Sequence, residues 1–159
     1  MTLDDVREVF EHSPWVAERA WESGEFRSAD ELHAAMMAVV REASREEQLA
    51  LVRAHPELAG AQAVAGRMTP ASTGEQGRLG FDRMSRGELD KMRELNKSYR
   101  EKFGFPCIVA LRLHGSRDSV LAAMQRRLKN SAATEMANAL DQIGHIARGR
   151  LDKLAGWEK

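Results

Sequence analysis

Hydrophobic residues recur along the chain mostly at intervals of three and four positions, which is the spacing of one face of an α-helix. The clearest stripe is Leu89, Met92, Leu95, Tyr99 and Phe103, and Gly104 follows as an expected helix end. The same pattern predicts helices in these regions: 3–10, the stretches after Ser13, Ser28, Ser44 and Ser85, 116–130, and a long final helix from Ser131 or Thr134. We therefore expect an all-α fold.

Polar residues mark where several of these helices begin. Ser13 is expected to cap a helix whose first residue is Pro14. A serine followed three positions later by glutamate predicts a capping box, and the chain has three such pairs: Ser28 with Glu31, Ser44 with Glu47, and Ser85 with Glu88. The helix after Ser44 is expected to stop just before Pro56, because proline disfavours α geometry in the residue before it.

Two stretches lack the helical pattern. "FPCIVAL", residues 105–111, is a continuous apolar run that resembles a strand. No partner strand is predicted, so we interpret it as a buried extended segment between helices. The stretch 60–85, rich in glycine, threonine and serine, is the longest region expected to be irregular. No linker divides the chain, so residues 1–159 are predicted to form one domain of packed helices.

Composition narrows the class of protein. Hydrophobic residues are 43% and charged residues 30% of the 159 positions, as expected of a globular chain. Lysine plus arginine and aspartate plus glutamate both number 24, so net charge provides no general attraction to nucleic acid or to an anionic membrane. The single cysteine, Cys107, excludes an internal disulfide. No apolar run is long enough for a membrane span and the acidic N-terminus is unlike a signal peptide, so we expect the cytoplasm.

The sequence contains no recognisable metal or cofactor motif. Its five histidines are scattered, and HExxH, CxxC, a glycine-rich phosphate loop and GxSxG are all missing. Any chemistry is therefore expected to be general acid–base and electrostatic, with no metal and no cofactor.

His55, in "AHPELAG", is the first candidate for such chemistry. It lies at a predicted helix C-terminus, where the negative end of the helix dipole favours imidazolium by about 0.3–1 kcal/mol. We expect that its pKa needs no large shift for the ring to act near neutral pH. The alternative is a structural histidine that ends the helix and bonds to a carbonyl.

The segment "PASTGEQ", residues 70–76, crowds polar groups together. Ser72, Thr73, Glu75 and Gln76 surround Gly74 and offer hydroxyl, carboxylate and amide groups to a ligand. The alternative is a solvated loop or a helix start, in which Ser72 caps and Glu75 completes a capping box.

Arg150 interrupts the apolar stripe of the last helix, whereas Arg148 falls off that stripe. The stripe consists of Met136, Leu140, Ile143, Ala147, Arg150, Leu154 and Trp157. A buried guanidinium cannot lose its proton, so it needs hydrogen-bonding partners. Either a structural carboxylate or an anionic, carbonyl-rich ligand fits this need, and a side chain that reaches the surface is a third alternative.

Taken together, five segments resemble one family. They are "HSPWVAERAW" at 12–21, "HPELAG" at 55–60, "STGEQ" at 72–76, "LNKSYREKFGFP" at 95–106 and "IARGRL" at 146–151. In order and over essentially the whole chain, they are similar to the 2-oxo-4-hydroxy-4-carboxy-5-ureidoimidazoline (OHCU) decarboxylases of urate breakdown. Two departures are visible. Cys107 stands where the family commonly has phenylalanine, a change that could loosen the pocket wall, and the peroxisomal signal of eukaryotic members is missing, which indicates a bacterial-type cytoplasmic enzyme.

The resemblance implies an all-helical, usually homodimeric enzyme that converts OHCU to (S)-allantoin without metal or cofactor. It implies that His55 is catalytic, that Glu75 binds and catalyses, and that Arg150 is a functional arginine. The substrate-binding residues that it implies are Pro56, Ser72, Thr73, Gly74 and Gln76, together with the backbone of Ile108, Val109, Ala110, Leu111 and Arg112.

A mechanism fits these residues. The substrate carries its own electron sink, a C=N bond beside the carbon that loses carbon dioxide, so no organic cofactor is required. His55 is expected to act as general base and then acid on the hydroxyl or the enol, while Glu75 orients His55 or holds the hydroxyl. Ser72 and Gln76 are expected to hold ureido and ring groups. We expect Arg150 on ring carbonyls or as the partner of Glu75, because a tight pair with the reacting carboxylate would stabilise the reactant.

Other functions are compatible with the same residues. A helical module that binds a small molecule or another protein is one alternative, in which Trp15, Trp21 and the many methionines line a groove. A hydrolase on the same scaffold, with His55 and Glu75 acting on water, is the other.

Overall fold

The computed structural model describes residues 1–60, 66 and 68–154. These residues form helices and contain no strand, so the all-α prediction is confirmed. In chain order the elements are α1 (Leu3–Val6), α2 (Trp15–Trp21), α3 (Ala29–Glu42), α4 (Arg45–Arg53), α6 (Pro70–Arg78), α7 (Arg86–Phe103), the 3₁₀ helix η1 (Leu111–Leu113), α8 (Arg117–Arg127) and α9 (Ala132–Asp152). Within this part of the chain, no helix has the length and apolarity needed to cross a bilayer.

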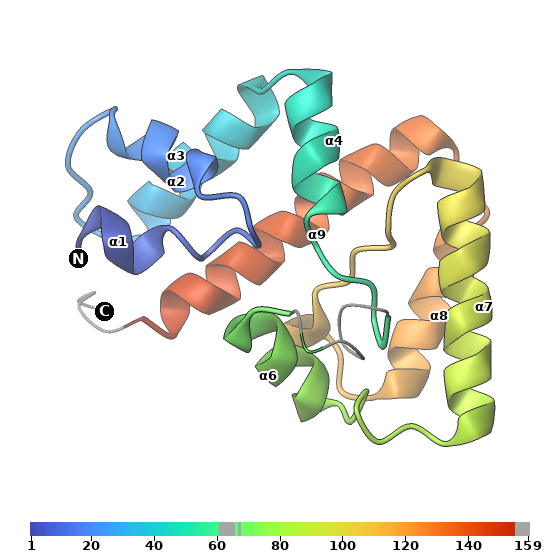
Figure 1. The fold of residues 1–159 in the computed structure, drawn as a ribbon. Coiled ribbons are helices and arrows are strands. Elements are labelled where there is room, and N and C mark those ends of the chain that lie inside the picture. Colours follow the sequence, from blue (N-terminus) through green and yellow to red (C-terminus); the bar gives the residue numbers. More distant parts are fainter. Residues whose placement is uncertain (61–65, 67, 155–159) are drawn as a thin grey trace.

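The long helix α9 crosses the middle of the molecule (Figure 1). Helices α3, α4 and α7 and the 3₁₀ helix η1 all pack against it, while α2 packs on α3 and α8 packs on α7. Figure 1 shows α1, α2 and α3 at one end, α7 and α8 at the other, and α6 below α9. The two ends of α9 therefore belong to different groups of helices.

Helix α9 packs on its neighbours through a buried apolar face and one glycine. Ala139, Ile143, Ala147 and Leu151 recur at intervals of four and are buried. Gly144 lies against Met37 of α3, where a Cβ atom would come within 3.0 Å of the methionine Cε atom. The predicted stripe is thus only partly the buried face: Met136, Leu140 and Leu154 are half-buried, and Trp157 lies outside the described residues.

The capping predictions are confirmed at two helices and wrong or incomplete at two. Ser44 with Glu47 and Ser85 with Glu88 form full capping boxes. The Ser28 side chain accepts a hydrogen bond from the Glu31 N–H, but the Glu31 carboxylate accepts from Arg27 instead of completing the box. Ser13 does not cap α2 with its side chain, so that prediction is wrong. Its hydroxyl donates to the Glu11 carbonyl, and Pro14 holds the cap position.

Helix ends follow the backbone preferences of proline and glycine. Helix α4 ends at Arg53, before Pro56 as predicted. Helix α7 ends at Phe103 and is capped by Gly104, whose φ of +80° is left-handed and whose N–H donates to the Arg100 carbonyl. The first helix is shorter than predicted. It ends at Val6, and Val9 and Phe10 are buried in the turns that follow.

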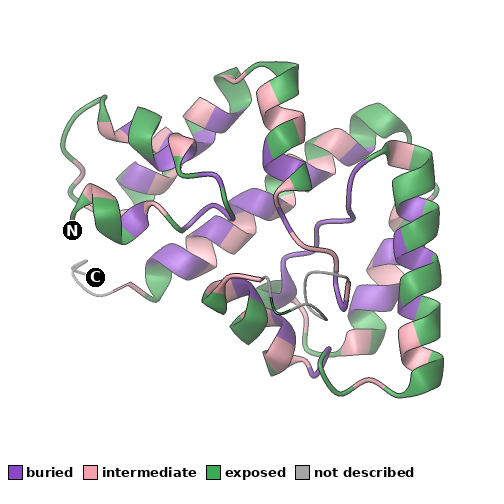
Figure 2. Ribbon diagram, viewed as in Figure 1, coloured by how far each residue is buried: buried purple, intermediate pink, exposed green. Residues whose placement is uncertain are grey.

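The segment 105–110 is extended and buried, as predicted, and Leu111 already belongs to η1 (Figure 2). Side chains satisfy part of its backbone. The Ala110 N–H donates to Gln142 of α9, and the Ile108 carbonyl accepts from Arg127 of α8. Such bonds are what a buried, non-helical backbone requires.

The prediction that 60–85 is irregular is wrong over 70–78, where α6 forms. Its cap is Thr69, whose side chain accepts from the Ser72 N–H, and Pro70 occupies the first turn. Ser72 and Glu75 therefore lie inside a helix instead of starting one. Residues 61–65 and 67 of this stretch lie outside the described residues.

Candidate active site

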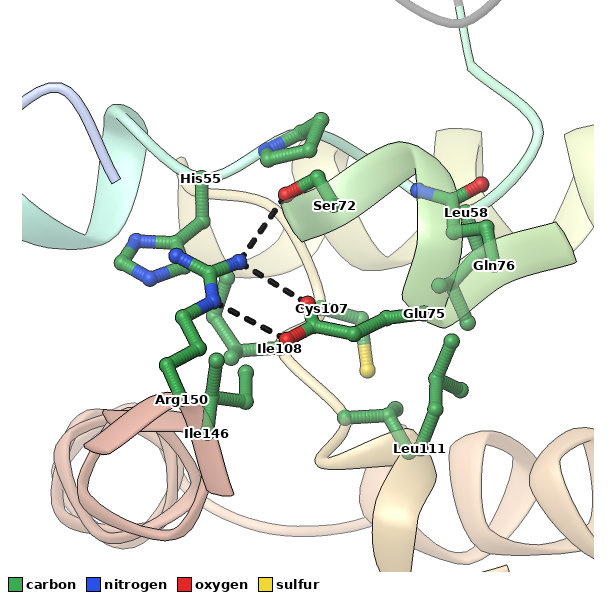
Figure 3. Close-up of a pocket in the computed structure, with 12 residues that line it drawn as sticks. His55, Leu58, Ser72, Glu75, Gln76, Cys107, Ile108, Leu111, Ile146 and Arg150 are labelled. Carbon is green, nitrogen blue, oxygen red and sulfur yellow. Dashed lines mark hydrogen bonds and ion pairs between the residues drawn. The ribbon is translucent and has the colours of Figure 1, made fainter. Parts of the chain in front are cut away.

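A small pocket lies where four parts of the chain meet. The turn after α4, the helix α6, the segment 105–111 and the C-terminal half of α9 all contribute to its wall (Figure 3). Its free volume is about 30 Å³, and we call it the inner pocket. The chain thus brings His55, Glu75 and Arg150 to one pocket, although they are far apart in sequence.

The His55 ring is buried and has one hydrogen-bonding partner. Its Nδ1 atom lies 3.0 Å from the Leu51 carbonyl oxygen, one turn earlier in α4. A carbonyl only accepts hydrogen bonds, so Nδ1 carries the proton and Nε2 carries a lone pair. Among the described residues, Nε2 has no hydrogen-bond partner. His55 therefore offers a free acceptor at a pocket that it lines.

Burial lowers the pKa of His55 to about 4, against an ordinary value of 6.5. The bond to the Leu51 carbonyl raises the pKa, and the positive charge of Arg150 lowers it. The expectation that the pKa of His55 needs no large shift is therefore wrong, because the cost of burying a charged ring outweighs the small dipole effect at the helix end. At neutral pH, His55 is an uncharged base.

Arg150 and Glu75 form a bidentate ion pair across the inner pocket (Figure 3). The Arg150 Nε atom is 2.9 Å from Glu75 Oε2, and Nη2 is 2.8 Å from Oε1. Arg150 also donates to the Ser72 hydroxyl and to the Val9 carbonyl. Burial lowers the pKa of Arg150, but the Glu75 hydrogen bonds and charge outweigh this and raise it above its ordinary value. Of the alternatives left open for Arg150, the structural carboxylate is the one observed.

Glu11 is a second carboxylate beside Arg150, and the sequence analysis missed it. Its side chain is fully buried and accepts hydrogen bonds from Thr69, Ser72 and Arg150. Burial raises the pKa of Glu11, but the bonds from Ser72 and Thr69 and the charge of Arg150 outweigh it and hold the pKa low. Glu11 is thus ionised. Its signal in the sequence is weak, because it follows the apolar pair Val9 and Phe10 outside any helical stripe.

Ser72, Gln76 and Pro56 also line the inner pocket. Gln76 connects α6 to the turn that carries His55: its Oε1 atom accepts from the Ala59 N–H at 3.0 Å, and its Nε2 atom donates to the Glu57 carbonyl. The Ser72 hydroxyl lies between Glu11 and Arg150. The Gln76 and Ser72 side chains therefore connect the segments that form the pocket wall.

The predicted backbone stretch lines the inner pocket only in part. Ile108, Val109 and Leu111 line it, and Ala110 instead donates to Gln142. Gly74 and Arg112 line a neighbouring hollow, and Thr73 lies on another side of α6, where its hydroxyl donates to the Thr69 carbonyl. Cys107 lines the pocket wall, and the lining residues that the sequence analysis did not assign are Leu58 and Ile146.

The OHCU decarboxylase family model matches residues 2–152 of the chain. The chain belongs to this family. It is 46% identical over 149 residues to the 2-oxo-4-hydroxy-4-carboxy-5-ureidoimidazoline decarboxylase of Haloferax volcanii, and the match covers 94% of this chain and 86% of that protein.

Two solved structures share the fold. One is an (S)-allantoin synthase, with a TM-score of 0.73 and 29% identity, and the match covers 94% of this chain and 48% of that one. This chain therefore spans about half the length of that protein. The other is an OHCU decarboxylase in the presence of (S)-allantoin, with a TM-score of 0.74 and 23% identity over 94% of this chain and 96% of that one.

For a chain of the OHCU decarboxylase family, the inner pocket combines three chemical elements. An uncharged imidazole offers a lone pair, a carboxylate is fixed by a buried arginine, and apolar side chains form much of the remaining wall. Cys107, which departs from the family's common phenylalanine, is part of the apolar wall, and burial raises the pKa of its thiol to about 12. The arrangement is suited to proton transfer by His55, while Cys107 stays a neutral thiol.

Proposed function

We propose that this chain decarboxylates OHCU to (S)-allantoin and that the reaction takes place in the inner pocket. Membership of the OHCU decarboxylase family supports the reaction. The observation that carries the assignment of the site is the buried, uncharged His55, whose Nε2 lone pair is free and whose pocket also holds the Arg150–Glu75 pair.

The proposed reaction begins with loss of carbon dioxide. The bond to the carboxylate breaks, and its electron pair forms a C=C bond with the neighbouring ring carbon. The C=N electrons move to the ring nitrogen, which takes a proton from solvent. His55 Nε2 then accepts the proton of the enol hydroxyl and returns it to the neighbouring carbon, so the ring amide carbonyl forms and one enantiomer of allantoin results.

We assign Glu75 to the substrate hydroxyl. The described contacts include no hydrogen bond between Glu75 and His55, so of the two predicted roles the hydroxyl contact is the one we propose. Arg150 holds the Glu75 carboxylate in place through two hydrogen bonds. With Glu11 and Glu75 against one arginine, the site is net negative, which disfavours a charged reactant carboxylate relative to neutral carbon dioxide.

Substitution of the proposed base and carboxylate tests this assignment. The substrate is generated in situ with the hydrolase that precedes this step, and optically active allantoin is followed by circular dichroism. His55→Asn and Glu75→Gln are expected to keep the fold and to lose about 10²–10⁴-fold in stereospecific turnover, the usual value of a positioned proton transfer. His145→Asn, on the exposed side of α9, is the matched control. Near-wild-type formation of (S)-allantoin by His55→Asn would refute the assignment.

The same assay separates the other predicted functions. A binding module would not change the rate at which the unstable intermediate disappears. A hydrolase would consume the intermediate without releasing carbon dioxide. Formation of optically active allantoin together with release of carbon dioxide would thus identify OHCU as the substrate.

We also propose, from the family resemblance, that the chain works as a homodimer in the cytoplasm. The remaining predicted contacts, from Pro56, Ser72, Thr73, Gly74 and Gln76 and from the backbone of 108–112, stay part of the proposal.

A further inference from the structure

A second hollow adjoins the inner pocket, and we call it the outer hollow. It is lined by Gly74, Arg78, Arg112, Gly149, Asp152 and Lys153, and its free volume is about 280 Å³. Glu75, Leu111 and Ile146 line both spaces. The two spaces therefore share a wall, and that wall includes the carboxylate assigned to the substrate hydroxyl.

The size of the inner pocket indicates that a substrate needs the outer hollow as well. About 30 Å³ accommodates little more than a water molecule, whereas pockets for small organic ligands usually measure about 300–1,000 Å³. A ring with ureido, hydroxyl and carboxylate substituents is much larger than the inner pocket. The outer hollow has room for the part of the ligand that projects past Glu75.

The outer hollow is positively charged. Arg78 donates to the backbone carbonyls of Leu111 and His114, and in the described part of the chain neither Arg78 nor Lys153 forms an ion pair with a carboxylate. Asp152 lies 4.0 Å from Arg112 and 3.0 Å from Arg148, so its negative charge is already shared. The other carboxylate, Glu75, is neutralised by Arg150.

We propose that the outer hollow is an electrostatic entrance, which attracts a small ureido carboxylate and delivers it past Glu75 to the inner pocket. The inference rests on the proposed function, because it names how that substrate reaches that site. Clefts lined by charge of one sign raise the rate of association with ions of the opposite sign. The outer hollow thus attracts the anion that the net negative inner pocket does not.

The outer hollow attracts the substrate carboxylate but does not bind it tightly. The Arg112 side chain is 41% exposed and lies near Asp152, and exposed ion pairs contribute little binding free energy. A tight ion pair would stabilise the carboxylate that must be lost, so long-range attraction serves the reaction better than a clamp. The positive charges of the outer hollow are therefore expected to speed capture of the substrate and to leave the rate of the chemical step unchanged.

Removal of two charges tests the entrance. The double variant Arg112→Gln with Lys153→Gln is expected to lower kcat/KM about 3- to 10-fold at an ionic strength of about 0.01 M, where the Debye length is about 30 Å. The proposed substrate contact of Arg112 is through its backbone, which the substitution keeps, so the loss is expected in KM and not in kcat. At about 0.5 M salt the difference between the two proteins is expected to vanish.

A matched variant controls for net charge. Arg86→Gln with Lys91→Gln removes the same two charges from α7, away from both spaces, and is expected to behave as wild type does. Equal kcat/KM for the wild type and the outer-hollow variant at low salt would overturn the entrance, even though (S)-allantoin is formed. No turnover by the wild type would instead overturn the proposed function.

Direct binding gives a second readout that needs no turnover. Allantoate, an open-chain ureido carboxylate, and uncharged allantoin are titrated calorimetrically at low and high salt. Wild type is expected to bind allantoate less tightly as salt rises, and the Arg112→Gln/Lys153→Gln variant is expected to bind it about 3- to 10-fold more weakly at low salt. Allantoin binding is expected to change little in either comparison. No binding of allantoate to wild type, or equal binding to both proteins, would contradict the entrance.

Two glycines of α6 test the route by size. A Cβ atom at Gly74 or at Gly77 would meet no heavy atom within 4 Å, but only Gly74 lines the outer hollow. Gly74→Leu is therefore expected to lower kcat/KM at every salt concentration, whereas Gly77→Leu is expected to leave it near wild type. Equal effects of the two variants would contradict entry through the outer hollow.

Discussion

Arg150 joins three distant parts of the chain at one guanidinium. It bonds to Glu75 and Ser72 of α6, to Glu11 and to the Val9 carbonyl, and it comes itself from α9. Removal of Arg150 from this buried set would leave Glu11 and Glu75 without their shared cation, which is costly. The geometry of Glu75 therefore depends also on Glu11 and Val9, which do not line the inner pocket.

His55 makes the folding stability depend on pH. The unfolded chain binds a proton near pH 6.5, and the folded protein binds it only near pH 4. Stability from this group is complete above pH 6.5 and is lost as the pH falls toward 4, by about 3 kcal/mol in total. We expect His55→Asn to flatten this part of the profile, measured by urea unfolding between pH 7 and 4.5.

The exposed His145 provides the control for this experiment. His145→Asn is expected to retain the loss of stability between pH 6.5 and 4.5. If wild type and His55→Asn lose the same stability over this range, His55 does not stay uncharged in the folded protein.

At the residue scale, the sequence shows that a buried polar side chain requires hydrogen-bonding partners, but it does not show which residues those partners are. Arg150 interrupts an apolar stripe, and this alone implies hydrogen-bonding partners. That one partner is Glu11 does not follow, because Glu11 lies in turns where no periodicity indicates its direction. The pKa of His55 was equally inaccessible, since burial of the ring depends on which segments cover it.

At the scale of elements, a buried network holds the extended segment 105–110. Glu135, at the start of α9, accepts hydrogen bonds from Tyr99, Arg127, Asn130 and Asn138. Burial raises the pKa of Glu135, but these hydrogen bonds outweigh it and keep the pKa low. Arg127 also donates to the Ile108 carbonyl. One side of the inner pocket is thus fixed by an ion pair that lies behind it.

Loss of Arg127 is expected to destabilise the fold strongly. The Arg127 side chain is 12% exposed and that of Glu135 is fully buried, so Arg127→Leu leaves a buried negative charge without its cation. The expected loss is about 3–5 kcal/mol in the free energy of unfolding, measured with urea.

Two further variants make this prediction specific. Arg126→Leu, at the neighbouring exposed position, is expected to change stability by less than about 0.5 kcal/mol. Adding Glu135→Gln to Arg127→Leu removes the unpaired charge and is expected to restore part of the loss. A similar loss from Arg126→Leu and Arg127→Leu would show that the ion pair is not the cause.

Most helices could be predicted, because their signals are local. Capping serines, Pro56 and Gly104 act within one turn of the helix end that they mark. Helix α6 was missed because two glycines, Pro70 and three hydroxyl residues depress helix propensity over 69–77. Thr69 followed by Pro70 is nevertheless a helix-start signal, and given its full weight it would have located α6.

At the scale of the whole molecule, the path of the chain around α9 did not follow from the sequence. Periodicity identifies which face of a helix is buried but not which helix covers it. The convergence of His55, Glu75 and Arg150 was expected only from the family resemblance. The boundary of the domain, 1–159, stays a prediction, and the family model matches residues 2–152.

The expected assembly can be measured directly. We predict that sedimentation equilibrium at micromolar protein concentration gives twice the mass of one chain. The exposed charged pair Lys97→Gln with Glu101→Gln, which keeps net charge at zero, serves as a surface control and is expected to give the same mass. A mass equal to one chain would contradict the homodimer.

Helix α9 carries Glu135, the centre of the network that holds segment 105–110, near its start and Arg150 near its end. Because each residue turns an α-helix by about 100°, inserting or deleting a single residue between them would swing Arg150 away from Glu75 while Glu135 stays in place. Lengthening by two full turns would restore the direction but shift the guanidinium by roughly 10 Å along the axis. The number of residues between Glu135 and Arg150 therefore fixes where the guanidinium lies. We expect natural variants to tolerate substitutions along α9 far better than changes in its length.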